Sequence, residues 1–119
     1  MLNDFTENSK QVWLYSTATD MRKSIDALTV IIAEQIAAEV SSGDLFVFYN
    51  KQRDKIKIIF YQTNGFCIFY KRLEKQKFHI PDITIKSKQI TYQQLRWIMD
   101  GLDITNLEGH KAVNYSIFY

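Results

Sequence analysis

A predicted β-hairpin over residues 55–73 constrains the fold of this 119-residue chain more than any other segment. Residues 55–61 and 66–73 are rich in β-branched and aromatic side chains, which favour strands. Asn64-Gly65 stands between them, and this pair is preferred in a two-residue type I′ turn because both positions there have positive φ. The segment therefore predicts two antiparallel strands joined by a tight turn.

The predicted turn also sets the register, because it pairs Thr63 with Phe66 and every further pair follows by counting outward. Lys57 then faces Arg72, and Lys55 faces Glu74. One face carries Lys55, Lys57, Ile59, Tyr61, Phe66, Ile68, Tyr70 and Arg72, and the other carries Ile56, Ile58, Phe60, Cys67, Phe69, Lys71 and Leu73. The second face has the composition of a core, whereas the first joins cations to aromatic rings.

Further strands are predicted at residues 12–15 and 45–49, again from aromatic and β-branched side chains. Residues 45–73 would then form an antiparallel meander at the centre of the sheet. The aromatic tail, residues 104–119, has a composition that suits an additional edge strand. Because the strands run together between helices, the fold class is α+β, with an antiparallel sheet of three to five strands.

Two principal helices are expected to flank this sheet. The first spans about residues 20–40, where apolar residues recur at spacings of three and four behind a capping residue at position 19 or 20. The second spans about residues 91–101, because Thr91 and Gln94 fit a capping box. Together these elements form one domain over residues 1–119.

The composition is that of a cytoplasmic globular protein. Apolar residues make up 46% of the chain and charged residues 24%, which are ordinary values for a folded domain. Cys67 is the only cysteine, so no internal disulfide is expected. The N-terminus lacks the pattern of a secretory signal, and no apolar run is long enough to cross a membrane.

Basic charge is concentrated on the predicted hairpin. Residues 50–77 carry eight basic side chains against two acidic ones, although the whole chain has a net charge of only +2. Such a distribution favours a polyanionic partner, and nucleic acid is the first candidate. On the hairpin and the turn before it, the candidate contact residues are Arg53, Lys55, Lys57, Tyr61, Tyr70, Lys71 and Arg72. Alternatively, the hairpin face that joins cations to aromatic rings contacts no nucleic acid. Its cations are then only solvated, and its aromatic rings pack under a helix.

Catalysis is not expected. His79 and His110 are the only histidines, too few with a single cysteine for a zinc site. The acidic residues show no spacing typical of metal ligands, and phosphate-loop and hydrolase motifs are missing from the sequence. We therefore expect no metal and no cofactor.

Several motifs resemble one bacterial family. Read in order, VWLY, TDMRKSIDAL, GDLFVF, NKQRDKIKIIFYQTNGFCIFYKRLEKQKF and ITYQQLRWIMDGLD resemble the TnpB-type (Orf2) accessory proteins of the IS66 class of insertion sequences. The resemblance covers about residues 12–103, between a polar leader (1–11) and the tail. The characteristic basic residues of the family fall on Arg22, Lys23, Arg53, Lys57, Lys71 and Arg72. The resemblance therefore adds Arg22 and Lys23 to the candidate contact residues.

The resemblance implies a non-catalytic accessory role in transposition beside a separate transposase and another accessory protein of the element. Two hypotheses follow. The chain binds DNA through its basic and aromatic hairpin, or it is an adaptor that docks on the transposase or the other accessory protein without binding DNA. Self-association into a homodimer, through Trp13, Trp97 and the aromatic tail, is compatible with both.

Overall fold

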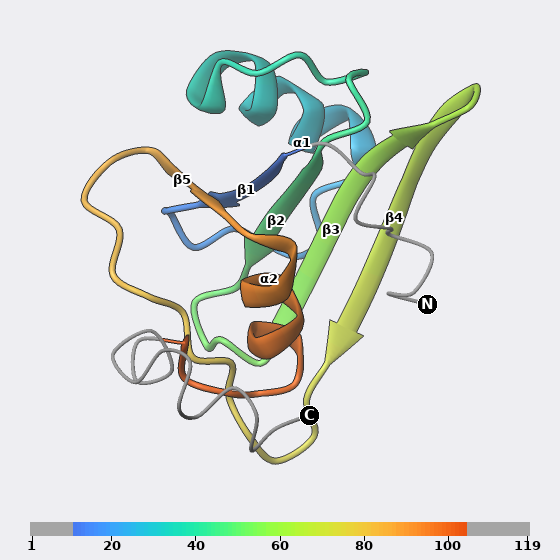
Figure 1. The fold of residues 1–119 in the computed structure, drawn as a ribbon. Helices are drawn as coiled ribbons and strands as arrows, with labels where there is room; N and C mark the ends of the chain where they lie inside the picture. The colour runs from blue at the N-terminus through green and yellow to red at the C-terminus, as the bar shows by residue number, and fades with distance from the viewer. Residues whose placement is uncertain (1–10, 105–119) are drawn as a thin grey trace.

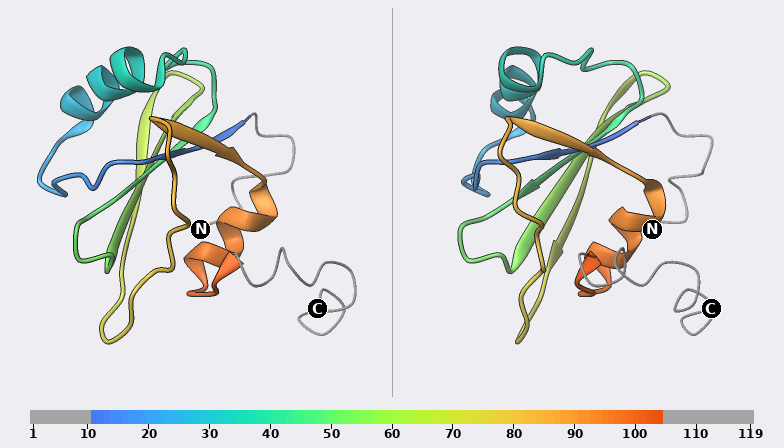
Figure 2. Two further views of the ribbon diagram at one scale, coloured as in Figure 1. Left: turned by 90° about the vertical axis from the view of Figure 1, so that its left-hand side faces the viewer. Right: turned by 60° about the vertical axis from the view of Figure 1, so that its left-hand side comes forward.

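The computed structural model describes residues 11–104, in which one five-stranded sheet separates two helical layers (Figure 1). The strands are β1 (Val12–Tyr15), β2 (Leu45–Tyr49), β3 (Lys55–Gln62), β4 (Gly65–Arg72) and β5 (Ser87–Ile90), in the spatial order β4-β3-β2-β1-β5. The helices are α1 (Ile25–Ile31), the π-helical turn η2 (Ile32–Ile36) that continues it, and α2 (Tyr92–Met99). Figure 2 shows α1 and α2 on opposite sides of the sheet.

The sheet is mixed, so the prediction of a purely antiparallel sheet is wrong, while the α+β class is confirmed. Strand β1 pairs in parallel with β2, and the other three pairings are antiparallel. The physical reason is the long connection through α1, which returns the chain to the end of the sheet where β1 began. Strand β5 was not predicted, because its sequence SKQI is poor in strand-forming residues. The predicted tail strand lies outside the described residues.

Strand β2 is buried on both faces and supplies both hydrophobic cores. Leu45, Val47 and Tyr49 pack in the cluster that includes α2. Phe46 and Phe48 point the other way and pack in the cluster that includes α1 and η2. Each side of the sheet therefore needs its own helical layer.

The first helix is shorter than predicted, because α1 begins at Ile25 and η2 ends at Ile36, where Ala37 takes the left-handed conformation (φ 60°). The predicted stripe is nevertheless present in its buried residues, which are Leu28, Ile32 and Ile36. Asp20 does not cap the helix; its carboxylate accepts a hydrogen bond from the backbone N–H of Arg22 at 2.9 Å. This bond closes a turn before the helix begins.

The start of α2 confirms the predicted capping box. The Thr91 hydroxyl accepts a hydrogen bond from the Gln94 N–H at 3.0 Å, and the Gln94 side chain accepts one from the Thr91 N–H at 2.8 Å. Gly101, just beyond the helix, has φ 84°, a conformation that side chains disfavour. The local sequence therefore fixes both ends of α2.

The hairpin register differs from the prediction by two residues. Gln62 pairs with Gly65, so the turn consists of Thr63 and Asn64, and Thr63 takes the positive φ of 60°. The Asn64 N–H donates back to the Gln62 carbonyl at 2.6 Å. Because side chains alternate with a period of two, a shift of two residues changes the partners and leaves every side chain on its predicted face.

Replacing the capping hydroxyl should weaken α2 measurably. We expect Thr91→Ala to lower the free energy of unfolding by about 1 kcal/mol, read from urea denaturation followed by circular dichroism. Thr84→Ala is the matched control, because Thr84 is exposed in the loop before β5. Equal urea midpoints for the two variants would show that the capping box does not stabilise the fold.

Candidate nucleic-acid interface

The structure brings six of the candidate residues together on the α1 side of the hairpin. In β3 and β4, Lys55 lies opposite Arg72 and Lys57 lies opposite Tyr70. The segment before α1 joins them, because the Lys57 ammonium reaches the backbone of that segment. We call this surface the basic platform, and it consists of Arg22, Lys23, Lys55, Lys57, Tyr70 and Arg72.

Lys57 ties the two parts of the platform together. Its Nζ donates to the carbonyl oxygen of Met21 at 2.6 Å and to that of Lys23 at 3.0 Å. The same ammonium lies 6.0 Å from the centre of the Tyr70 ring, within the range of a cation–π contact. The expected pairing of Lys57 with Arg72 is therefore wrong, and the side chain instead holds the 21–23 segment against the hairpin.

Two cations of the platform face each other directly, and each has its own carboxylate. Lys55 lies opposite Arg72, an arrangement of like charges that by itself destabilises a sheet. Lys55 pairs with Asp54 at 3.3 Å, and Arg72 pairs with Glu74 at 3.1 Å. The expected register, with Lys55 facing Glu74, is shifted by two residues. Both cations are thus locally neutralised.

The cations of the 21–23 segment are exposed to solvent. Arg22 pairs with Asp20 at 2.7 Å, and its side chain is 91% exposed. Hydrogen bonds from the guanidinium hold the pKa of Asp20 well below its ordinary value. Arg22 precedes α1, so it does not form a helical ion pair with Asp26 in the first turn. Lys23 is exposed, and its ammonium has no ion-pair partner among residues 11–104.

Tyr70 and Tyr61 lie on the same face of the hairpin in different environments. Tyr70 is 48% exposed at the centre of the platform. Tyr61 is closer to the turn and half-buried, with its ring edge-on to Phe66 at 5.0 Å between centroids. About half of Tyr70 is therefore accessible to solvent, whereas the ring of Tyr61 is partly covered by its neighbour.

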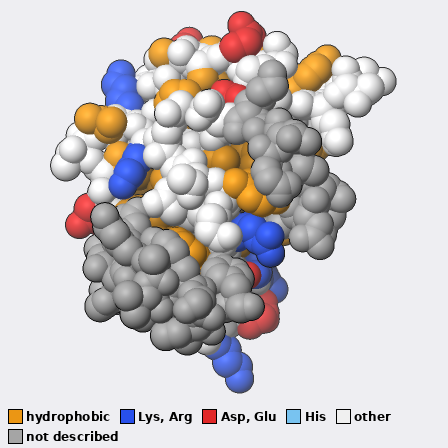
Figure 3. All heavy atoms as spheres, in the orientation of Figure 1, with side chains coloured by type: hydrophobic (Ala, Val, Ile, Leu, Met, Phe, Trp, Pro, Cys, Tyr) orange, Lys and Arg blue, Asp and Glu red, His pale blue; other side chains and the backbone are white. Residues whose placement is uncertain are grey.

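Lys71 and Arg53 lie on the α2 side of the sheet, away from the platform. The Lys71 ammonium donates to the carbonyl of Met99 at 2.9 Å, at the end of α2 where the helix dipole favours a cation. The Arg53 guanidinium lies 5.9 Å from the centre of the Tyr49 ring, and Tyr49 belongs to the α2-side cluster. Figure 3, which views this side, shows basic side chains at separate points.

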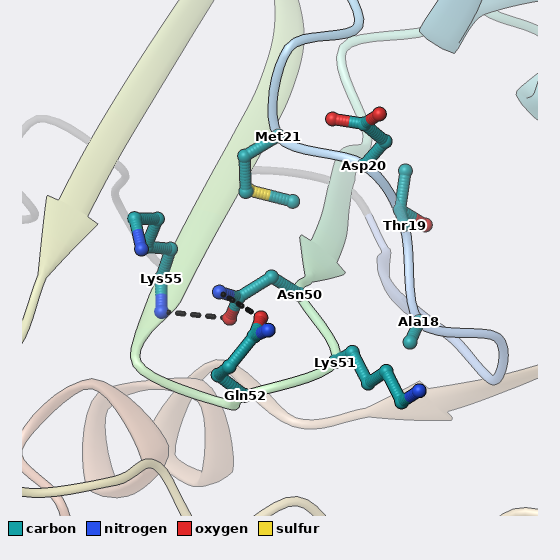
Figure 4. A pocket seen from close by; sticks show the side chains of 8 residues that line it. All are labelled: Ala18, Thr19, Asp20, Met21, Asn50, Lys51, Gln52 and Lys55. Atoms are coloured by element: carbon teal, nitrogen blue, oxygen red, sulfur yellow. Dashed lines mark hydrogen bonds between the residues drawn. The ribbon is translucent and has the colours of Figure 1, made fainter.

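A hollow of about 440 Å³ lies next to the platform, between the segment before α1 and the turn from β2 to β3 (Figure 4). It is lined by Ala18, Thr19, Asp20, Met21, Asn50, Lys51, Gln52 and Lys55. Of these residues, only Lys55 was predicted from the sequence as a contact residue. The basic turn was visible in the sequence, but its proximity to residues 18–21 depends on the parallel pairing of β1 with β2.

Asn50 shapes this turn. Its Oδ1 accepts hydrogen bonds from the N–H groups of Asp54 and Lys55 at 3.1 and 2.9 Å, and its Nδ2 donates to Asp54 Oδ1 at 2.6 Å. The last of these bonds lowers the pKa of Asp54. Because the amide is fully engaged, the position of Lys55 at the edge of the hollow is fixed.

Three further features concern residues 11–104. No three His, Cys, Asp or Glu side chains in this part of the chain come together in an arrangement that would hold a metal ion. No helix within the same residues is long and apolar enough to cross a membrane. Cys67 is a half-buried free thiol opposite Phe60.

Comparison with known proteins places the chain among the accessory proteins of insertion sequences. It belongs to the family described as IS66 Orf2 like protein, which matches residues 10–109, so the resemblance indicated by the motifs is confirmed. This is not a known catalytic family.

Two curated relatives are uncharacterized proteins of Sinorhizobium fredii. The chain is 30% identical to y4hO over 93 residues, which cover 78% of this chain and 81% of the relative. It is 24% identical to y4jC over 98 residues, which cover 82% and 84%. No solved structure is significantly similar to the chain.

The contacts of Lys57 predict a structural effect that can be separated from any binding. We expect Lys57→Met to lower the free energy of unfolding by about 1.5–3 kcal/mol, because hydrogen bonds from a charged donor are lost. Hydrogen exchange of the Lys23 amide, which donates to the Asp20 carbonyl at 3.1 Å, should become faster.

The matched control for this experiment is Lys88→Met, which makes the same change on β5. Lys88 is also half-buried, and its ammonium has no hydrogen bond among the described residues. If Lys57→Met and Lys88→Met unfold at the same urea concentration, Lys57 does not anchor the 21–23 segment.

Proposed function

We propose that this accessory protein binds DNA through the basic platform during transposition of its insertion sequence. The observation that carries the proposal is the grouping of five cations and the exposed residue Tyr70 on the α1 side of the sheet, where Lys57 joins the 21–23 segment to the hairpin. Positive charge beside an accessible aromatic ring suits a phosphate backbone with adjacent bases. No chemical step is assigned to the chain.

The carboxylates that pair with the platform cations should weaken DNA binding only slightly. Exposed ion pairs are worth about 0–1 kcal/mol in water, and the Arg22 and Arg72 pairs are exposed. A phosphate group can therefore take the place of a carboxylate at either guanidinium with a small loss. The hairpin segment as a whole keeps its basic excess, which favours the approach of a polyanion.

One observation supports the second candidate, a protein-interaction adaptor. Asp20, Asp54 and Glu74 alternate with the cations of the platform, and mixed charge of this kind can be matched by a protein surface of complementary pattern. In that function the platform docks on the transposase or on the other accessory protein of the element. The salt dependence of DNA binding separates the two candidates.

The experiment is fluorescence anisotropy with labelled DNA over a series of salt concentrations. Wild-type protein should bind with an affinity that falls linearly with salt on a log–log scale. For Lys23→Gln/Arg72→Gln, removal of two phosphate contacts should reduce the slope by about 1.8 on duplex DNA. These two positions are chosen because both side chains are exposed and neither anchors the fold.

The matched control is Lys86→Gln/Arg96→Gln, which removes the same charge from exposed positions off the platform. It should leave the slope close to the wild-type value. An equal loss in both double variants would mean that only net charge matters, and the platform would be rejected as the binding site. Absence of DNA binding at about 50 mM salt, together with binding to the transposase, would replace the proposal by the adaptor function.

A further inference from the structure

The hollow beside the platform has the size and the lining of a site for a small planar group. Its volume of about 440 Å³ lies in the range of small-molecule pockets. Ala18 and Met21 give it an apolar wall, and the side-chain amide of Gln52 lies on the opposite side (Figure 4). A nucleobase has this same combination of apolar faces and polar edges.

Cations flank the hollow on two sides. Lys51 is exposed and has no ion-pair partner among the described residues, and Lys55 shares its charge with Asp54. An apolar wall between two ammonium groups is complementary to a nucleotide, whose base is apolar on its faces and whose phosphates are anionic. The bases of a duplex are stacked and paired, so only an unpaired base can enter such a site.

The platform supplies a second position for a base. Lys55 and Lys57 lie two residues apart on one face of β3, a separation of about 6.6 Å along the strand. This separation is comparable to that of successive phosphates along one nucleic-acid strand. Lys57 ends beside the exposed ring of Tyr70, on which a base can stack.

From this arrangement we propose that the platform recognises single-stranded DNA, with one unpaired base in the hollow and another base stacked on Tyr70. The inference rests on the proposed function and narrows it to one class of DNA. The phosphates between the two bases would lie along Lys55 and Lys57, and Lys51 would contact the phosphate beyond the hollow.

The test compares labelled probes with equal numbers of phosphates: a thymine single strand, an abasic strand and a short duplex. Wild-type protein should bind the single strand at least about tenfold more tightly than the abasic strand, because the loss of even one stacked base has about that effect. Ala18→Leu, which narrows the hollow, and Tyr70→Ala should each reduce this preference. Tyr70→Phe should retain it, because the ring remains.

Ala33→Leu is the matched control for Ala18→Leu, since Ala33 is exposed on η2, away from the hollow. Equal affinity for all three probes would show that the protein reads only phosphates, which overturns this inference and leaves the proposed function standing. An unchanged preference in both Ala18→Leu and Tyr70→Ala would overturn it as well. Failure to bind any probe would reject the proposed function itself.

Discussion

The burial of β2 on both faces is the constraint on which the rest of the structure depends. All five of its side chains are buried, and each contributes about 1.5–3 kcal/mol when removed from water. A strand of this kind must lie inside a sheet and must have a cover on both sides, so β1 and β3 flank it and helices form two layers. The layers on the two sides of the sheet cover β2 completely. This cover ends along the hairpin, where Ile59 is buried and Tyr70 is 48% exposed. The platform lies where this cover ends.

Lys57 supplies hydrogen bonds to the backbone at the edge of the covered part of the sheet. The chain between β1 and α1 must cross the hairpin, and its carbonyl groups at Met21 and Lys23 accept hydrogen bonds from the Lys57 ammonium. A cation that donates twice to backbone carbonyls is well suited to a half-buried position, because its charge is compensated without a carboxylate. The same side chain places Arg22 and Lys23 near β3. One structural contact therefore determines which basic residues can act together.

The sequence predicted what depends on local chemistry and missed what depends on long-range pairing. The Thr91–Gln94 capping box was predicted because all of its hydrogen bonds lie within one turn. The predicted register of the hairpin was wrong, because Thr63 rather than Gly65 took the left-handed conformation. The two faces were nevertheless predicted correctly, because the register error was an even number of residues. The parallel β1–β2 pair and β5 were missed because neither follows from neighbouring residues. The hollow was missed for the same reason, and the platform was predicted only in its hairpin part.

The sequence suggested that the cations responsible for the basic excess of the hairpin are also the cations of the platform. In the structure the two sets coincide only in part. On the platform, Arg22, Lys55 and Arg72 each have a carboxylate partner, which relieves the repulsion between Lys55 and Arg72 in the free protein. Within residues 50–77 the excess charge then resides on the cations without a carboxylate partner among the described residues, namely Lys51, Arg53, Lys57, Lys71, Lys75 and Lys77. Charges act over about 8–10 Å at moderate salt, so these cations can attract a polyanion to the surface before any ion pair opens. Attraction and contact are thus carried by overlapping but different sets of residues, and a count of charges along the chain finds the first set more readily than the second.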